Sequence, residues 1–290
     1  RQVDNLPHGE RQVADVPPQA PEARAWLGSA VAIKDPTSAL FLRQNGSNLL
    51  IVGHREEAAL GVLAAAMISL AAECRGLGTS VPSNTTGSTA KFYILDGTRA
   101  DAPEAGYWNR LAAAIPGVKQ AGVRDAASLV AEIAAELAAR QQQAHDDHAP
   151  IFLFIYNLGR FRDLRKEDEY GFSSDDQPAS PAKQFADILR EGPPLGIHTL
   201  VWCDTYSNVT RILDRRNMQD FEMRILFQMN GNDSSSLMDT PEAAKLGVHR
   251  AILYDEGQGT SEKFRPYGLP SNEYLASLAQ QLAPYSSRST

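Results

Sequence analysis

Residues 48–63 read NLLIVGHREEAALGVL, and this stretch decides the fold of the chain. An apolar run ends at Gly53, and apolar residues at helical spacing begin a few positions later. This order of strand, glycine and helix is typical of a loop whose backbone N–H groups surround the phosphates of a nucleotide. The stretch therefore predicts an α/β fold built around a phosphate-binding loop.

The residues that would bind the phosphates are absent from this loop. A working loop carries Gly-Lys-Ser or Gly-Lys-Thr, because the lysine reaches the β- and γ-phosphates and the hydroxyl binds Mg²⁺. This chain has Ala58, Ala59 and Leu60 at those positions. Glu56 and Glu57 add negative charge, which favours the first turn of a helix and repels a polyphosphate. We therefore expect a nucleotide-binding fold whose own site has decayed.

The composition is that of an ordinary globular protein, with 43% hydrophobic and 22% charged residues among 290. The net charge of −7 argues against broad nucleic-acid binding by the whole surface. Because no apolar run approaches the ~20 residues that cross a bilayer, we expect no membrane contact. Cys74 and Cys203 indicate buried, reduced thiols of a cytoplasmic protein. The His-Asp-Asp-His run at 145–148 fits a loop better than a metal site, so we expect no metal.

Apolar runs alternate with helical patterns along most of the chain. Strands are expected at 30–36, 48–52, 91–96, 150–157, 197–203 and 223–229, with a hairpin at 251–254 and 263–267. Helices are expected at 56–74, 107–114, 125–143 with Asp125 as N-cap, 182–190, 208–221 and 271–282. Loops or turns are expected at 76–90, 162–182 and 231–236. The alternation predicts a mainly parallel sheet with helices on both faces.

One domain is expected over 26–282. Residues 1–25 carry four prolines and favour a linker or extended arm, and 283–290 favour a disordered tail. Ligands of such folds bind at the carboxyl ends of the strands, which here carry His54, Asp96, Tyr156, Asn157 and Asp204.

The order of these segments resembles the motor domain of the FtsK/SpoIIIE DNA translocases. It is similar to the wider FtsK–HerA group of bacterial ATPases, which includes the type VII secretion ATPases. The resemblance covers about 26–270. The most specific parts are Gly-Ile-His before an apolar strand at 196–204, and Arg-Ile-x-Phe-Gln before Asp-Ser at 224–234. It implies a RecA-like P-loop NTPase fold.

The departures from this family fall on its catalytic positions. Its Walker B strand ends in Asp-Glu, which orders Mg²⁺ and polarises the attacking water, whereas this chain has Tyr156 and Asn157. The sensor glutamine becomes Asp204. Because electrostatic and metal stabilisation supply most of phosphoryl-transfer catalysis, the resemblance implies a pseudo-ATPase with no intact catalytic residue. A vestigial nucleotide site would consist of Gly53, His54, Asp96 and Asp204.

The resemblance implies a domain of a larger ATP-driven translocase that serves ring assembly, regulation or partner binding. Its partners would be other domains or subunits of the ring, DNA passing through it, or a protein, with DNA the favoured cargo. No cofactor is expected. The alternatives are a DNA translocase that binds ATP and Mg²⁺ at an unorthodox site, and a substrate-binding domain of the type VII secretion kind.

Arginines suggest two further roles. Arg215, Arg216 and Arg224 are candidates for donation to the nucleotide of a neighbouring subunit, although Arg224 also fits a salt bridge at the sheet edge. A basic run at 160–166 and the arginines at 211–216 are candidates for a weak DNA contact. Interleaved aspartates and glutamates equally fit a solvated, acid-paired surface.

Overall fold

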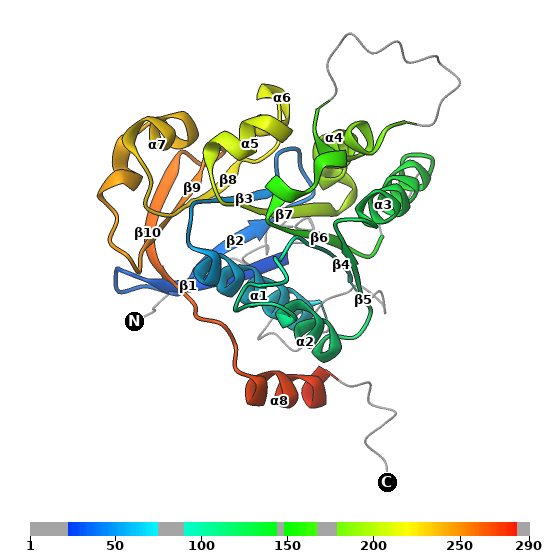
Figure 1. Ribbon diagram of the computed structural model, residues 1–290, viewed down its shortest axis with the longest axis horizontal. Coiled ribbons are helices and arrows are strands. Elements are labelled where there is room, and N and C mark those ends of the chain that lie inside the picture. Colours follow the sequence, from blue (N-terminus) through cyan, green and yellow to red (C-terminus); the bar gives the residue numbers. More distant parts are fainter. Residues whose placement is uncertain (1–22, 75–89, 144–147, 167–178, 283–290) are drawn as a thin grey trace, which may run out of the picture.

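The computed structural model describes residues 23–74, 90–143, 148–166 and 179–282, which form one ten-stranded sheet with helices on both faces (Figure 1). The strands in chain order are β1 (Ala23–Ala30), β2 (Thr37–Phe41), β3 (Leu49–Val52), β4 (Lys91–Asp96), β5 (Val118–Gly122), β6 (Ile151–Tyr156), β7 (Ile197–Cys203), β8 (Met223–Leu226), β9 (Ala251–Asp255) and β10 (Thr260–Pro266).

The sheet order is β2-β1-β10-β9-β8-β3-β7-β6-β4-β5. Strands β8, β3, β7, β6, β4 and β5 are parallel, and the remaining strands continue the sheet in antiparallel fashion. Every residue of β3, β6 and β7 is buried, as expected for central strands that are covered on both faces. The predicted α/β architecture with a mainly parallel sheet is therefore confirmed.

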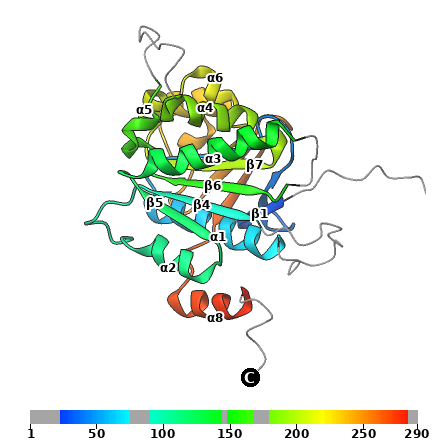
Figure 2. The same cartoon turned by 90° about the vertical axis from the view of Figure 1, so that its right-hand side faces the viewer.

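Helices cover the two faces of the sheet in two layers, which Figure 2 shows from the side. One layer contains α1 (Glu56–Glu73), α2 (Tyr107–Ala114) and α8 (Asn272–Leu282). The other contains α3 (Ala126–Gln141), α4 (Pro181–Glu191), α5 (Tyr206–Ile212) and α7 (Gly231–Met238). Short helical pieces are α6 (Arg215–Gln219), η1 (Leu158–Arg160), η2 (Arg162–Leu164), η3 (Pro193–Leu195) and η4 (Pro241–Lys245).

Helix α1 is buried along most of its length, because it lies between the sheet and the chain that leads to α8. Gly61 permits the closest approach, since a Cβ there would lie 2.4 Å from the backbone oxygen of Tyr267. In the described part of the chain, no helix combines the length and apolar character needed to cross a bilayer. Cys203 is buried and Cys74 half-buried, and burial raises the pKa of each thiol to about 12.

The strand expected at 30–36 is wrong. β1 ends at Ala30, and the following bend places Val31 and Ile33 in solvent, with exposed fractions of 57% and 109%. The apolar alternation there belongs to a turn between two strands. Strand β1 also includes residues 23–25, which the sequence places in the arm. Residues 1–22, 76–89, 145–147, 167–178 and the tail at 283–290 lie outside the described residues.

Two further expectations need correction. The helix at 208–221 is divided into α5 and α6, because Leu213 is extended and the side chain of Asp214 accepts the N–H of Asn217 at 2.8 Å to start a new helix. The turn at 231–236 is helical and belongs to α7, which Asn230 caps. Asp125 occupies the N-cap position of α3 as expected, although its side chain makes no capping hydrogen bond. Strand β5 was missed, because this edge strand is half-exposed and lacks an apolar run.

Candidate functional site

The carboxyl ends of the parallel strands all lie at the same end of the strands, which is where α1 begins (Figure 1). Ligands of open α/β sheets bind at this edge, between the strand ends and the helices that follow. The connections after β3, β4, β6 and β7 carry the polar positions expected at the strand ends. Each connection shows whether a nucleotide and its metal ion would fit.

Three residues, from Gly53 to Arg55, link β3 to α1. The helix is already regular at Ala59, whose N–H donates to the carbonyl of Arg55 at 2.8 Å. The positions of the missing Gly-Lys-Thr, Ala58 to Leu60, therefore lie inside α1, and Ala59 and Leu60 are fully buried. Because the helix begins before these positions, the short link cannot surround a phosphate in the way that a phosphate-binding loop does.

Side chains of the sheet side, Phe227 and Trp202, contact the link between β3 and α1 at Gly53. Gly53 has a φ of +133°, and a Cβ at this position would lie 2.8 Å from the Cβ of Phe227. Its carbonyl accepts a hydrogen bond from the indole Nε1 of Trp202 at 3.0 Å. The glycine therefore allows the sharp turn and the close approach of a sheet side chain, which is a structural use of its freedom.

The mouth of the site carries both signs of charge. Glu56 and Glu57 are exposed in the first turn of α1. They line a hollow of about 610 Å³ together with Arg55, Arg250 and Arg265. The last two arginines were missed from sequence, because they come from the far end of the chain and reach this edge only through the fold. The two glutamates partly offset the charge that these arginines would offer to an anion.

Tyr156, which the sequence resemblance aligns with the family's metal-binding aspartate, is buried beneath the first turn of α1. The side chain is 2% exposed, and its ring centroid lies 4.6 Å from that of Trp202 and 5.9 Å from that of Trp108. Its hydroxyl donates to the carbonyl of Glu56 at 3.4 Å. Burial, with nearby carboxylates, raises the pKa of this phenol, which therefore stays neutral. A neutral phenol among aromatic rings is a poor ligand for Mg²⁺.

The next residue, Asn157, has a left-handed backbone with a φ of 63°. Asn tolerates this conformation better than most residues other than glycine. It turns the chain from β6 into η1, so the position of the family's water-polarising glutamate is part of a tight turn.

The two aspartates at strand ends each accept hydrogen bonds from groups of this chain. Asp96 accepts the backbone N–H of Thr98 at 2.8 Å, and Gln120 Nε2 donates to its other oxygen at 3.2 Å. Asp204 accepts from Asn208 Nδ2 at 2.7 Å. His54 is exposed beside α1. Within the described ranges, no three His, Cys, Asp or Glu side chains form a group suited to a metal ion.

The three arginine candidates differ in exposure. Arg224 is 8% exposed, donates to the carbonyl of Leu237 at 2.8 Å, and is paired with Glu256. It therefore acts as a brace within this chain and is not available to a neighbouring subunit, so that candidate is wrong. Arg215 and Arg216 are exposed on α6.

His198, from the Gly-Ile-His segment, supports the amino end of the sheet rather than the site. Its Nδ1 lies 2.8 Å from the carbonyl oxygen of Ser47, and its ring contacts Phe41 and Phe152. Burial lowers its pKa from 6.5 to about 4, and the positive charges of Arg43 and Arg140 act in the same direction. The buried ring is therefore neutral at physiological pH.

This histidine should make the domain sensitive to mild acid. The unfolded chain binds a proton at His198 below about pH 6.5 whereas the folded chain does not, so stability falls as pH falls toward 4. Between pH 7 and pH 5 the native chain should lose about 2 kcal/mol more unfolding free energy than His198→Gln, as measured by urea denaturation. Parallel losses in the two proteins would contradict a buried neutral histidine.

Solved structures share this architecture. Thermomonospora curvata EccC (ATPases 2 and 3, in complex with a signal sequence peptide) matches with a TM-score of 0.60 and 16% identity over 90% of this chain and 47% of that chain. The fold is thus one that solved ATPase domains also have. EssC (ATPases 2 and 3) from Geobacillus thermodenitrificans matches with a TM-score of 0.60 and 14% identity over 97% of this chain and 51% of that chain.

The pCW3 conjugation coupling protein TcpA, with ATPgS, matches with a TM-score of 0.61 and 11% identity over 90% of this chain and 71% of that chain. The RecA-like P-loop NTPase fold implied by the sequence resemblance is thus confirmed. The chain spans about half the length of the EccC and EssC chains that it matches. No protein-family model and no curated protein match the sequence.

The residues at the start of α1 and at the end of β6 do not fit Mg²⁺ and ATP. The lysine and hydroxyl positions are occupied by buried apolar side chains inside α1. The metal-binding position is occupied by a buried phenol that is bonded to the first turn of the same helix. The side chains at these positions pack in the core and supply neither a phosphate ligand nor a metal ligand.

Proposed function

We propose that this chain is a catalytically degenerate ATPase domain, which neither binds nor hydrolyses ATP at the site between β3 and α1. It acts through its surfaces within a larger ATP-driven translocase. One observation carries this proposal, namely that the buried ring of Tyr156 occupies the metal-binding position and packs between Trp108 and Trp202. A site of this kind would have to be unpacked before a nucleotide and its metal could enter, which costs several kcal/mol.

The partner that we propose is another domain or subunit of the same machine. Arg215 and Arg216 are exposed on α6 and have the chemistry to stabilise charge on a neighbour's nucleotide. DNA remains our proposed cargo for the machine as a whole. We also propose that this machine is bacterial and that this domain lies in the cytoplasm.

Phosphate release from Mg²⁺ and ATP tests the enzymatic half of the proposal. The chain should show no rate above that of buffer, and Asn157→Glu, which restores the family's acidic residue, should not create one. The reason is that transition-state charge has no metal or lysine to stabilise it. A steady rate that disappears in Tyr156→Phe or Asn157→Ala would overturn the proposal, because it would place the chemistry at these positions.

A further inference from the structure

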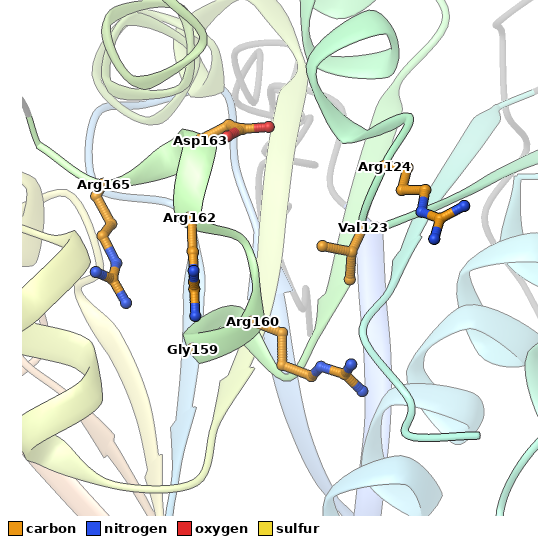
Figure 3. Close-up of a pocket in the computed structure, with 7 residues that line it drawn as sticks. All are labelled: Val123, Arg124, Gly159, Arg160, Arg162, Asp163 and Arg165. Atoms are coloured by element: carbon orange, nitrogen blue, oxygen red, sulfur yellow. The ribbon is translucent and has the colours of Figure 1, made fainter. Parts of the chain in front are cut away.

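A second hollow, of about 550 Å³, lies at the same edge of the sheet but on the other face (Figure 3). It is formed where the link between β5 and α3 meets η1 and η2. Its lining contains Arg124, Arg160, Arg162, Arg165 and one acidic residue, Asp163. The decayed nucleotide site lies on the α1 side of the strand ends, whereas this hollow lies on the side of α3 and α4.

The local sequence explains why the arginines face outward. Buried apolar side chains recur every three residues after β6, at Leu158, Phe161 and Leu164. This spacing matches a 3₁₀ helix, in which residues i and i+3 lie on the same side. The three side chains pack into the α3 face of the core, so the arginines between and after them remain at the surface.

Arg124 joins them through the topology of the sheet. It follows β5, and β5 and β6 lie on either side of β4 in parallel register. Their carboxyl ends therefore reach the same edge, and a residue far from the basic run in sequence lines the same hollow.

Two carboxylates of the described ranges act on this hollow, since Asp163 lines it and Asp101 lies within electrostatic reach of Arg160. The ion pairs of the described residues all involve other basic side chains, and none involves an arginine that lines the hollow. Arg160 is steadied by backbone carbonyls, to which it donates at 3.4 Å (Gly97) and 3.2 Å (Thr98). The carboxylate of Asp163 points away from the guanidinium groups of Arg160, Arg162 and Arg165 (Figure 3).

We propose that this hollow binds a short oligophosphate anion of two or three linked phosphates, either free or carried by a nucleotide. Guanidinium groups donate paired hydrogen bonds that match phosphate oxygens, and several of them here surround one concavity. The volume lies in the range of small-molecule sites. A long polyanion is less suited, because it would also meet the field of a chain with a net charge of −7. This site is independent of the proposed loss of ATP hydrolysis.

Calorimetry without Mg²⁺ at physiological salt tests the proposal, using sodium tripolyphosphate as the probe. The variant Arg124→Ala/Arg162→Ala removes two exposed arginines of the hollow, and Arg215→Ala/Arg216→Ala removes the same charge from α6. Tripolyphosphate should bind the native chain and the α6 variant with equal affinity within about twofold, and the hollow variant at least about tenfold more weakly. Thermal unfolding of each variant confirms that the fold is intact.

Two further titrations identify the source of the anion. If ATP competes with tripolyphosphate, the hollow accepts the phosphates of a nucleotide. If tripolyphosphate binds and ATP does not, the ligand is a free oligophosphate. The proposal is overturned by absence of tripolyphosphate binding at millimolar concentration, or by equal weakening in both variants, which indicates a general charge effect. It is also overturned if a DNA duplex alone binds and depends on the hollow arginines. Hydrolysis that persists in the hollow variant would refute the proposed function instead.

Discussion

Tyr156→Asp, which introduces the acidic residue that the sequence resemblance expects at the end of β6, should lower the unfolding free energy by about 4 kcal/mol or more. Removing a large buried aromatic ring costs about 3–5 kcal/mol, because the space that it leaves collapses only partly. The ring packs here between Trp108 and Trp202. A carboxylate at the same place would also be buried without a positive partner, which adds to the loss. Guanidinium denaturation measures this difference.

The control is Tyr156→Phe, which keeps the ring and removes only the 3.4 Å hydrogen bond to Glu56. Such a long bond should contribute about 1 kcal/mol or less. The contradicting result is an aspartate variant that is as stable as the phenylalanine variant and that gains affinity for Mg²⁺ and ATP. In that case a single substitution would restore a nucleotide site, and our interpretation of Tyr156 as a packing residue would be wrong.

Asn48→Leu should destabilise the domain by about 4 kcal/mol, although the two side chains are similar in size. The amide is fully buried and joins three segments, since Nδ2 donates to the carbonyls of Leu189 and Asp220 at 2.9 and 2.8 Å. Its Oδ1 accepts the N–H of Thr199 at 2.8 Å. Leucine would leave two buried acceptors and one buried donor without partners, at about 1–3 kcal/mol each.

The matched control is Asn230→Ala, which removes a capping asparagine at the exposed start of α7. Loss of an N-cap costs about 1 kcal/mol. Urea denaturation of the two variants at pH 7 should separate them by about 3 kcal/mol. Equal effects would show that the buried amide is not a joint between β3, β7 and α4.

The sheet could be predicted because its central strands are buried on both faces. Such strands, for example Ile151–Tyr156, are continuous apolar runs that local sequence reveals. Val118–Gly122 could not be found in this way, because an edge strand needs little apolar character. Its pairing with β4 depends on the tertiary structure, which a local pattern does not show. The split between α5 and α6 depends on Asp214 acting as a cap, which a helical pattern across the same residues concealed.

The candidate site could be predicted only in part. The substitutions at Ala58, Ala59 and Tyr156 were visible from their places in the motifs. What replaces the ligand was not visible, because Trp108 and Trp202 lie far from Tyr156 in sequence and meet it only through α2 and β7. A local pattern cannot reveal an aromatic cluster assembled from three separate elements.

The measurement that tests the central claim most directly is calorimetric titration of ATP, with and without Mg²⁺, into the Arg124→Ala/Arg162→Ala chain. Weakening the arginine hollow directs the test to the site between β3 and α1. We predict no saturable heat up to millimolar ATP under either condition, because the phosphate and metal ligands of this site are replaced by packing side chains. Saturable, Mg²⁺-dependent binding at micromolar ATP would contradict the account and show that the site still holds a nucleotide.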